Sequence, residues 1–331
     1  MSITEIINDQ IFPILPPNIG TLLKRIPESH LAAVTEIRLR INKPLMLIVG
    51  SEDYMISSTG SLVGETRNAY FCTNDDISRT FQLISKNSIY ALEQELKMGF
   101  LTARGGHRIG LTGQAIIVDG QLKAIKNINS LNIRLAREVK GCSCLVLPHI
   151  VKNGKRVLST LIISPPRCGK TTILRDIIRN LSTRSSAFVG VQVGVVDERS
   201  EIAASLNGIS TVDLGDRVDV LDGCPKSEGM LILIRSMSPQ VIATDELGRE
   251  EDAYAVREAL NAGISVIATI HGRSVAEVME RPYVGQLIKA KYFERYIILS
   301  DTPTIGTIQE IVDARTGNIL YQHKTGVKAC G

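Results

Sequence analysis

Residues 164–172, Ser-Pro-Pro-Arg-Cys-Gly-Lys-Thr-Thr, approach the pattern of a loop that binds phosphate. That pattern is a Gly, four residues, and Gly-Lys followed by Ser or Thr, and Ser164 stands where the first Gly is expected. Gly169 permits close approach of the backbone, Lys170 reaches the β- and γ-phosphates of a nucleotide, and the Thr171 hydroxyl ligates Mg²⁺. We therefore predict that ATP and Mg²⁺ bind at a loop formed by the following residues: Ser164, Pro165, Pro166, Arg167, Cys168, Gly169, Lys170, Thr171 and Thr172.

The flanks of this loop decide between a nucleotide site and a surface turn that happens to contain Gly-Lys-Thr. A β-branched run, residues 157–164, ends at the loop, and an amphipathic helix is predicted over residues 171–181. A strand, a loop and a helix in this order are what the motif requires, because the helix dipole favours an anion at the helix N-terminus. Arg167 occupies a position that is often small, so its side chain must point outward or contact a phosphate.

Two carboxylates follow a second apolar run, Gln-Val-Ile-Ala-Thr at residues 240–244. The carboxyl ends of parallel strands are where ligands bind in open α/β sheets. We predict that Asp245 holds Mg²⁺ or its waters and that Glu246 polarises the attacking water as a catalytic residue. The alternative is an acidic pair that enters an ordinary turn.

Two further strand ends carry polar side chains. The run Ser-Val-Ile-Ala-Thr-Ile at residues 265–270 leads to His271, which is predicted to face the γ-phosphate, the alternative being a structural histidine. The run at 193–197 ends in Asp197, followed by Glu198 and Arg199. Glu198 is predicted to contact the nucleotide, and the alternative is a solvated charged turn.

From about residue 150, predicted strands alternate with predicted helices, and these elements position the residues above. Apolar runs at 157–164, 193–197, 240–244 and 265–270 alternate with helical patterns, which predicts an α/β domain with a mostly parallel sheet. Two closing strands are predicted at residues 295–300 and 304–313, and a helix at residues 249–260.

The first part of the chain predicts a smaller α+β domain. One half-exposed antiparallel strand is expected at 34–50, a helix at 75–99 and a hairpin with glycine turns at 105–121. We place this domain at residues 1–140 and the nucleotide-binding domain at residues 141–331, with a linker near residues 139–148.

The composition favours a globular protein with reduced cysteines. The 331 residues are 44% hydrophobic and 22% charged, with a net charge of +4, which is ordinary globular composition and does not indicate a nucleic-acid partner. Six cysteines without regular spacing favour reduced thiols. Because no signal peptide and no long uncharged apolar run is found, we expect a cytoplasmic protein that reaches a membrane through partners.

Longer stretches of the chain resemble a known family. The phosphate loop, the Asp-Glu strand and the Thr-x-His strand are similar to those of the hexameric ATPases of type II and type IV secretion and of pilus machines. The stretch 215–253, together with Ile-Arg-Leu-Arg-Ile-Asn-Lys-Pro-Leu (37–45) and residues 88–115 and 130–144, resembles the stage III sporulation protein AA family. Asp245 replaces the Gly that most secretion ATPases have before the catalytic Glu, and the sporulation proteins share this trait.

The resemblance implies a RecA/AAA-like ATPase that forms a ring of six and works in the cytoplasm of the mother cell. Its hydrolysis of ATP would energise or assemble the channel complex between mother cell and forespore in endospore formation, with membrane-embedded partner proteins and no nucleic acid. In secretion ATPases some catalytic arginines come from the N-terminal domain, so the resemblance points to Arg134 and Arg137, with Arg104 and Arg108 as further candidates there and Arg217 as a similar candidate in the second domain. The alternative is that these arginines are ordinary charges on strand faces.

Two other functions stay open at this point. A nucleic-acid translocase could use the same core, although only 4% of the residues are aromatic and few could stack on bases. A scaffold that binds ATP without hydrolysing it would use the phosphate loop to lock contacts within the ring.

Overall fold

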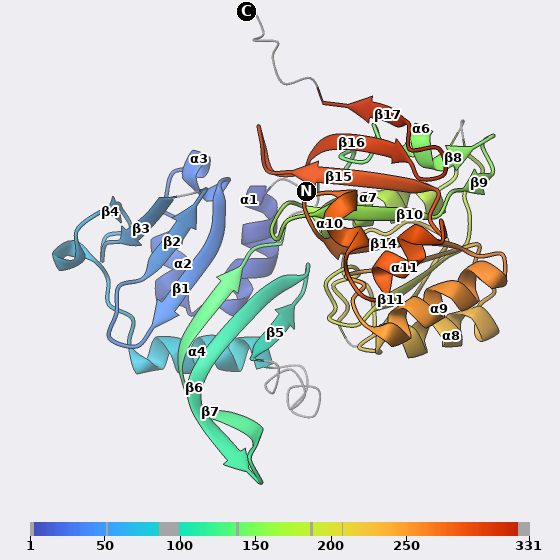
Figure 1. The fold of residues 1–331 in the computed structure, drawn as a ribbon. Coiled ribbons are helices and arrows are strands. Elements are labelled where there is room, and N and C mark those ends of the chain that lie inside the picture. Colours follow the sequence, from blue (N-terminus) through green and yellow to red (C-terminus); the bar gives the residue numbers. More distant parts are fainter. Residues whose placement is uncertain are drawn as a thin grey trace, which may run out of the picture. The chain divides into compact units, whose positions relative to one another are not determined.

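The computed structural model describes residues 3–50, 52–85, 99–136, 139–185, 188–206 and 208–323 (Figure 1). The chain divides into two compact units, residues 1–137 and 138–331, and each is described by itself.

In the first unit, the described residues form one antiparallel sheet in the order β4-β3-β2-β1-β7-β6-β5. Its strands are β1 (Val34–Arg40), β2 (Met46–Val49), β3 (Glu52–Ile56), β4 (Leu62–Val63), β5 (Phe100–Ala103), β6 (His107–Val118) and β7 (Gln121–Arg134). The helical elements are α1 (Ile3–Ile6), a π-helix (Ile7–Ile11), 3₁₀ turns (Phe12–Ile14 and Thr66–Asn68), α2 (Pro17–Leu23), α3 (Glu28–Leu31) and α4 (Asn74–Ser85). One cluster of buried apolar side chains joins these helices to the sheet.

Three predictions for this unit change in detail. The single strand predicted at 34–50 is wrong: it is two strands, β1 and β2, because Asn42 adopts a left-handed φ of 56° and Pro44 follows it. The helix predicted at 75–99 is α4 up to Ser85, and its remainder, 86–98, lies outside the described residues. The stretch 105–121 holds one long strand, β6, between two glycine-containing turns, so it belongs to two hairpins.

The second unit contains the predicted mostly parallel sheet. Its order among the described residues is β12-β11-β13-β14-β10-β15-β16-β17, parallel except for the last two pairings. The strands are β10 (Thr160–Ser164), β11 (Val193–Asp197), β12 (Val218–Asp222), β13 (Val241–Thr244), β14 (Ser265–His271), β15 (Arg295–Ser300), β16 (Thr307–Asp313) and β17 (Ile319–Gln322), and β8 (Val151–Lys152) and β9 (Arg156–Val157) form a separate hairpin.

Helices cover both faces of this sheet. Successive side chains of a strand point to opposite faces, so neighbouring residues of β10 belong to different apolar clusters. Ile162 of β10 joins one apolar cluster with α6 (Leu147–Ile150) and α7 (Lys170–Ser182). Leu161 and Ile163 join another with α8 (Lys226–Ser236), α9 (Glu250–Asn261), α10 (Val275–Met279) and α11 (Val284–Lys289). Strands buried on both faces read as continuous apolar runs, which explains why the sequence shows them so clearly.

Across the part of the chain that the structure describes, no helix combines the length and the apolar character that crossing a bilayer needs.

Candidate nucleotide-binding site

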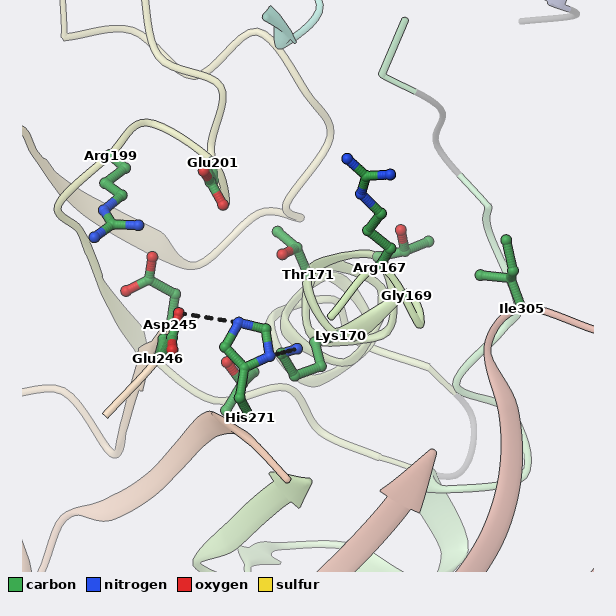
Figure 2. A pocket seen from close by; sticks show the side chains of 12 residues that line it. Arg167, Gly169, Lys170, Thr171, Arg199, Glu201, Asp245, Glu246, His271 and Ile305 are labelled. Carbon is green, nitrogen blue, oxygen red and sulfur yellow. Dashed lines mark hydrogen bonds and ion pairs between the residues drawn. The ribbon is translucent and has the colours of Figure 1, made fainter. Parts of the chain in front are cut away.

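Parallel pairing brings the polar strand ends to one edge of the second sheet. Ser164 of β10 pairs with His271 of β14, and Thr244 of β13 pairs with Ala268 of β14. A pocket of about 370 Å³ opens at this edge (Figure 2). It is lined by Arg167, Gly169, Lys170, Thr171, Thr172, Arg199, Glu201, Asp245, Glu246, Thr269, His271 and Ile305.

The loop between β10 and α7 has the shape that its glycine dictates. Gly169 adopts a left-handed φ of 80° as the N-cap of α7, and its carbonyl accepts the Ile173 N–H at 3.0 Å. Arg167 also has a positive φ, 63°, which costs an L-residue about 1–2 kcal/mol. Figure 2 shows its side chain directed away from Lys170. The loop therefore holds strain at the pocket, where α7 presents its N-terminal N–H groups.

Lys170 is buried within its own loop. Its ammonium lies 3.2 Å from the Pro165 carbonyl oxygen, 3.4 Å from the Ser164 carbonyl oxygen and 2.7 Å from His271 Nδ1. Burial lowers the pKa of Lys170, because the surroundings disfavour its charge more than nearby acids favour it. A phosphate group would supply the negative charge that this ammonium lacks.

His271 connects Lys170 to the acidic side of the pocket (Figure 2). The ammonium has no lone pair, so Lys170 donates and Nδ1 accepts. A neutral imidazole then carries its proton on Nε2, which lies 3.3 Å from Glu246 Oε2. Contacts thus run from Lys170 through His271 to Glu246.

Asp245 places a carboxylate at the pocket. Its Oδ1 is buried and accepts no hydrogen bond from the residues that the structure describes, while Lys226 Nζ lies 3.4 Å away. Burial raises the pKa of Asp245, and the Lys226 charge offsets part of that effect. A buried carboxylate oxygen without a hydrogen bond, in a pocket that Thr171 also lines, fits Mg²⁺.

The strand end at 197–199 differs from its prediction. Glu198 contacts Lys226, with Oε2 2.5 Å from Nζ, and is not among the described residues that line the pocket. Arg199 and Glu201 line it instead. The backbone turns sharply after β11, so the side chain that reaches the pocket lies further along the loop than strand periodicity suggests.

Asp197 shapes that turn. Its fully buried carboxylate accepts the backbone N–H groups of Glu201 at 2.8 Å, Ile202 at 2.9 Å and Ala203 at 2.8 Å. Burial raises its pKa to about 6 despite these hydrogen bonds. The residue holds the segment that carries Glu201 to the pocket.

We expect Asp197→Ala to lower the free energy of unfolding by about 2–4 kcal/mol, because three donors would lose their acceptor inside the protein. Urea unfolding measures this effect, with the exposed Asp216→Ala as the matched control. An unchanged stability together with lost nucleotide binding would show that Asp197 acts on the ligand directly.

The remaining predicted residues lie elsewhere. Ser164 and Cys168 are buried, Pro165 precedes the turn that Pro166 begins, and none of these four is among the described residues lining the pocket. Arg134 of the first unit lies 3.3 Å from Glu36, Nε to Oε1, and Arg137 lies outside the described residues.

Two of the other arginine candidates, Arg108 and Arg217, have contacts within their own units. The Arg108 guanidinium lies 3.6 Å from the centre of the Phe100 ring, and Arg217 donates to the Ser182 carbonyl at 3.0 Å. Arg104 lies in the turn between β5 and β6.

The sequence reasoning missed Glu201, Ile305 and Lys226. Ile305 precedes Gly306, whose Cα lies 3.4 Å from where a Cβ on Gly169 would stand, so this loop packs against the phosphate loop. Lys226 follows β12, a strand that its mixed polar pattern Val-Asp-Val-Leu-Asp concealed. The Asp-Gly-Cys-Pro-Lys run after that strand is the signal that could have identified the lysine.

Two solved structures share the fold. The ATPase DotB of Legionella pneumophila is similar over 80% of this chain and 71% of its own, with a TM-score of 0.50 and 16% identity. The pilus retraction motor PilT, solved with bound ADP, is similar over 82% of this chain and 75% of its own, with a TM-score of 0.52 and 14% identity. The predicted fold class, a RecA-like P-loop domain with a mostly parallel sheet, is confirmed.

Relatives in sequence extend over nearly the whole chain. The chain is 43% identical over 322 residues to the stage III sporulation protein AA of Bacillus subtilis strain 168, covering 97% of this chain and 100% of that protein. The family described as "Sporulation stage III, protein AA" matches residues 6–319. This chain therefore belongs to the sporulation stage III protein AA family, as its motifs predicted.

Proposed function

We propose that the chain binds ATP with Mg²⁺ in this pocket and hydrolyses it. We further propose that it is a secretion-type ATPase that energises or assembles a channel complex between mother cell and forespore during endospore formation. The main support is the convergence of the loop after β10, Asp245 and Glu246 after β13, and His271 of β14 in one pocket. PilT, which shares the fold, was solved with ADP.

The residues have distinct roles in this proposal. Lys170 binds the phosphates, while Thr171 and Asp245 hold Mg²⁺, which neutralises charge on the phosphates when bound. Glu246 orients and polarises the attacking water.

The contact between Lys170 and His271 suggests how the site senses nucleotide. When Lys170 turns to the phosphates, His271 Nδ1 loses its donor and is free to respond to the γ-phosphate. Because His271 also faces Glu246, the same event reaches the residue that handles water.

Assembly and place of action are part of the proposal. We propose a ring of six copies in the cytoplasm of the mother cell, docked on membrane-embedded proteins of the channel and without nucleic acid. Arg134 and Arg137 of the first unit would then complete the site across the ring, as a phosphoryl-transfer site gains greatly from an added arginine.

The direct test is ATP binding and hydrolysis by the purified chain, with Mg²⁺ and with EDTA, over a range of protein concentrations. We expect a fluorescent ATP analogue to bind, turnover to require Mg²⁺, and the rate per chain to rise with concentration as rings form. Absence of binding at every concentration would contradict the proposal. Binding without turnover, also in the presence of membranes from sporulating cells, would favour the scaffold.

A further inference from the structure

Lys226 is a buried cation that the proposed mechanism does not use. It begins α8 directly after β12, and 8% of its surface is exposed. A buried ammonium is costly without paired charges. Its Nζ lies 2.5 Å from Glu198 Oε2 and 3.4 Å from Asp245 Oδ1.

The two contacts of Lys226 are unequal. The short one, to Glu198, is a strong charge-assisted hydrogen bond. The longer one reaches an oxygen of Asp245 that accepts no hydrogen bond from the described part of the chain. Since Asp245 also lines the pocket, its carboxylate has the lysine on one side and the ligand space on another.

The order of the strands explains the arrangement. Glu198 follows β11, Asp245 follows β13 and Lys226 follows β12, and these three strands are neighbours in the order β12-β11-β13. Glu198 can therefore keep the lysine in place while Asp245 changes its partner.

We propose that Lys226 is an internal counter-ion that holds Asp245 in the nucleotide-free protein and yields this carboxylate to Mg²⁺ while remaining on Glu198. Lys226 is thus a positioning residue. The inference deepens the proposed function and rests on it for the identity of the incoming cation.

Loss of the ammonium has a distinct physical consequence. Without it, the carboxylates of Asp245 and Glu198 are left without their shared cation, and Glu201 adds negative charge at the same pocket. Carboxylate oxygens are the ligands that Mg²⁺ prefers. A divalent cation alone should then stabilise a chain that lacks the lysine, whereas the wild type already has its own cation there.

The test is thermal unfolding of the full chain without nucleotide, in Mg²⁺ and in NaCl of equal ionic strength. We expect Mg²⁺ to raise the Tm of Lys226→Met by about 4 °C or more and to leave the wild type unchanged. Lys226→Arg, which keeps the charge, should behave as the wild type. Lys140→Met is the matched control: Lys140 Nζ lies 2.6 Å from Asp213 Oδ2, and neither residue is among the described residues that line the pocket.

The same measurements separate this inference from the proposed function. Equal responses of wild type, Lys226→Met and Lys140→Met to Mg²⁺ would overturn the counter-ion role. If Lys226→Met does not fold without metal, Lys226→Gln replaces it, since glutamine can still donate to Glu198. A Gln variant indifferent to Mg²⁺ would likewise overturn the role. The Tm of the wild type in MgATP tests the proposed function. If MgATP leaves that Tm unchanged while Mg²⁺ raises the Tm of Lys226→Met, ATP binding is rejected and the counter-ion role of Lys226 stands.

Discussion

Replacing Glu246 by glutamine is expected to lower ATP turnover by about 10²–10⁴-fold while ATP binding persists. The two side chains have nearly the same shape, so the pocket keeps its form. The amide lacks the charge that polarises water, which corresponds to about 3–5 kcal/mol of lost transition-state stabilisation. Its contact with His271 Nε2, 3.3 Å in the wild type, is retained because the amide oxygen also accepts.

Single-turnover hydrolysis and equilibrium binding of a fluorescent ATP analogue measure the two quantities separately. Glu250→Gln is the matched control, because Glu250 is an exposed carboxylate four residues further on and is not among the described residues that line the pocket. Equal turnover in Glu246→Gln and the wild type would reject Glu246 as the catalytic residue.

The same variant tests the scaffold hypothesis in cells. If ATP only locks contacts in a ring, a chain that binds ATP without hydrolysing it should support endospore formation. If hydrolysis drives transport or assembly, Glu246→Gln should block the process at normal protein levels. The two hypotheses thus predict opposite spore counts.

The parallel sheet could be predicted because its strands are buried on both faces. The runs at 193–197 and 265–270 are almost wholly apolar, and they appear as β11 (Val193–Asp197) and β14 (Ser265–His271). β12 has partly exposed residues along its whole length, and two aspartates among its five residues interrupt the apolar run and conceal the strand. Edge position therefore limits what the pattern reveals.

Part of the pocket could be predicted from strand ends, but Glu198, which also directly follows a strand, is not among the described residues that line it. Asp245 and His271 follow directly from the sheet geometry, since carboxyl ends of parallel strands share an edge. Glu201 depends on the turn that Asp197 organises, and Lys226 depends on the start of α8. Hydrogen bonds between side chains and loop backbone leave no periodic signal in the sequence.

The arginines show another limit. Arg134 carries a charge that β7 presents next to Glu36 in the first unit. Its proposed role concerns another copy of the chain in a ring. No pattern within one chain encodes that placement, so the role stays a prediction.

Replacing Lys170 by alanine is expected to weaken ATP binding by about 10²-fold or more, because each charge-assisted hydrogen bond to phosphate contributes about 1.5–3 kcal/mol. Without nucleotide, the free energy of unfolding of this variant should not fall by a comparable amount. Burial lowers the pKa of Lys170, so its charged form is disfavoured in the folded state, and this costs stability at pH values below the ordinary pKa of lysine. Binding and folding should therefore respond differently to this substitution.

Titration with a fluorescent ATP analogue and urea unfolding without nucleotide measure the two effects. The exposed Lys155→Ala is the matched control for the loss of one positive charge. If Lys170→Ala binds ATP as the wild type does, the loop at 164–172 does not hold phosphate, and the proposed function fails at its first step. If the free energies of unfolding and of ATP binding fall by similar amounts, the role of Lys170 is structural. Its hydrogen bonds to Pro165 and His271 in the nucleotide-free protein would then account for both losses.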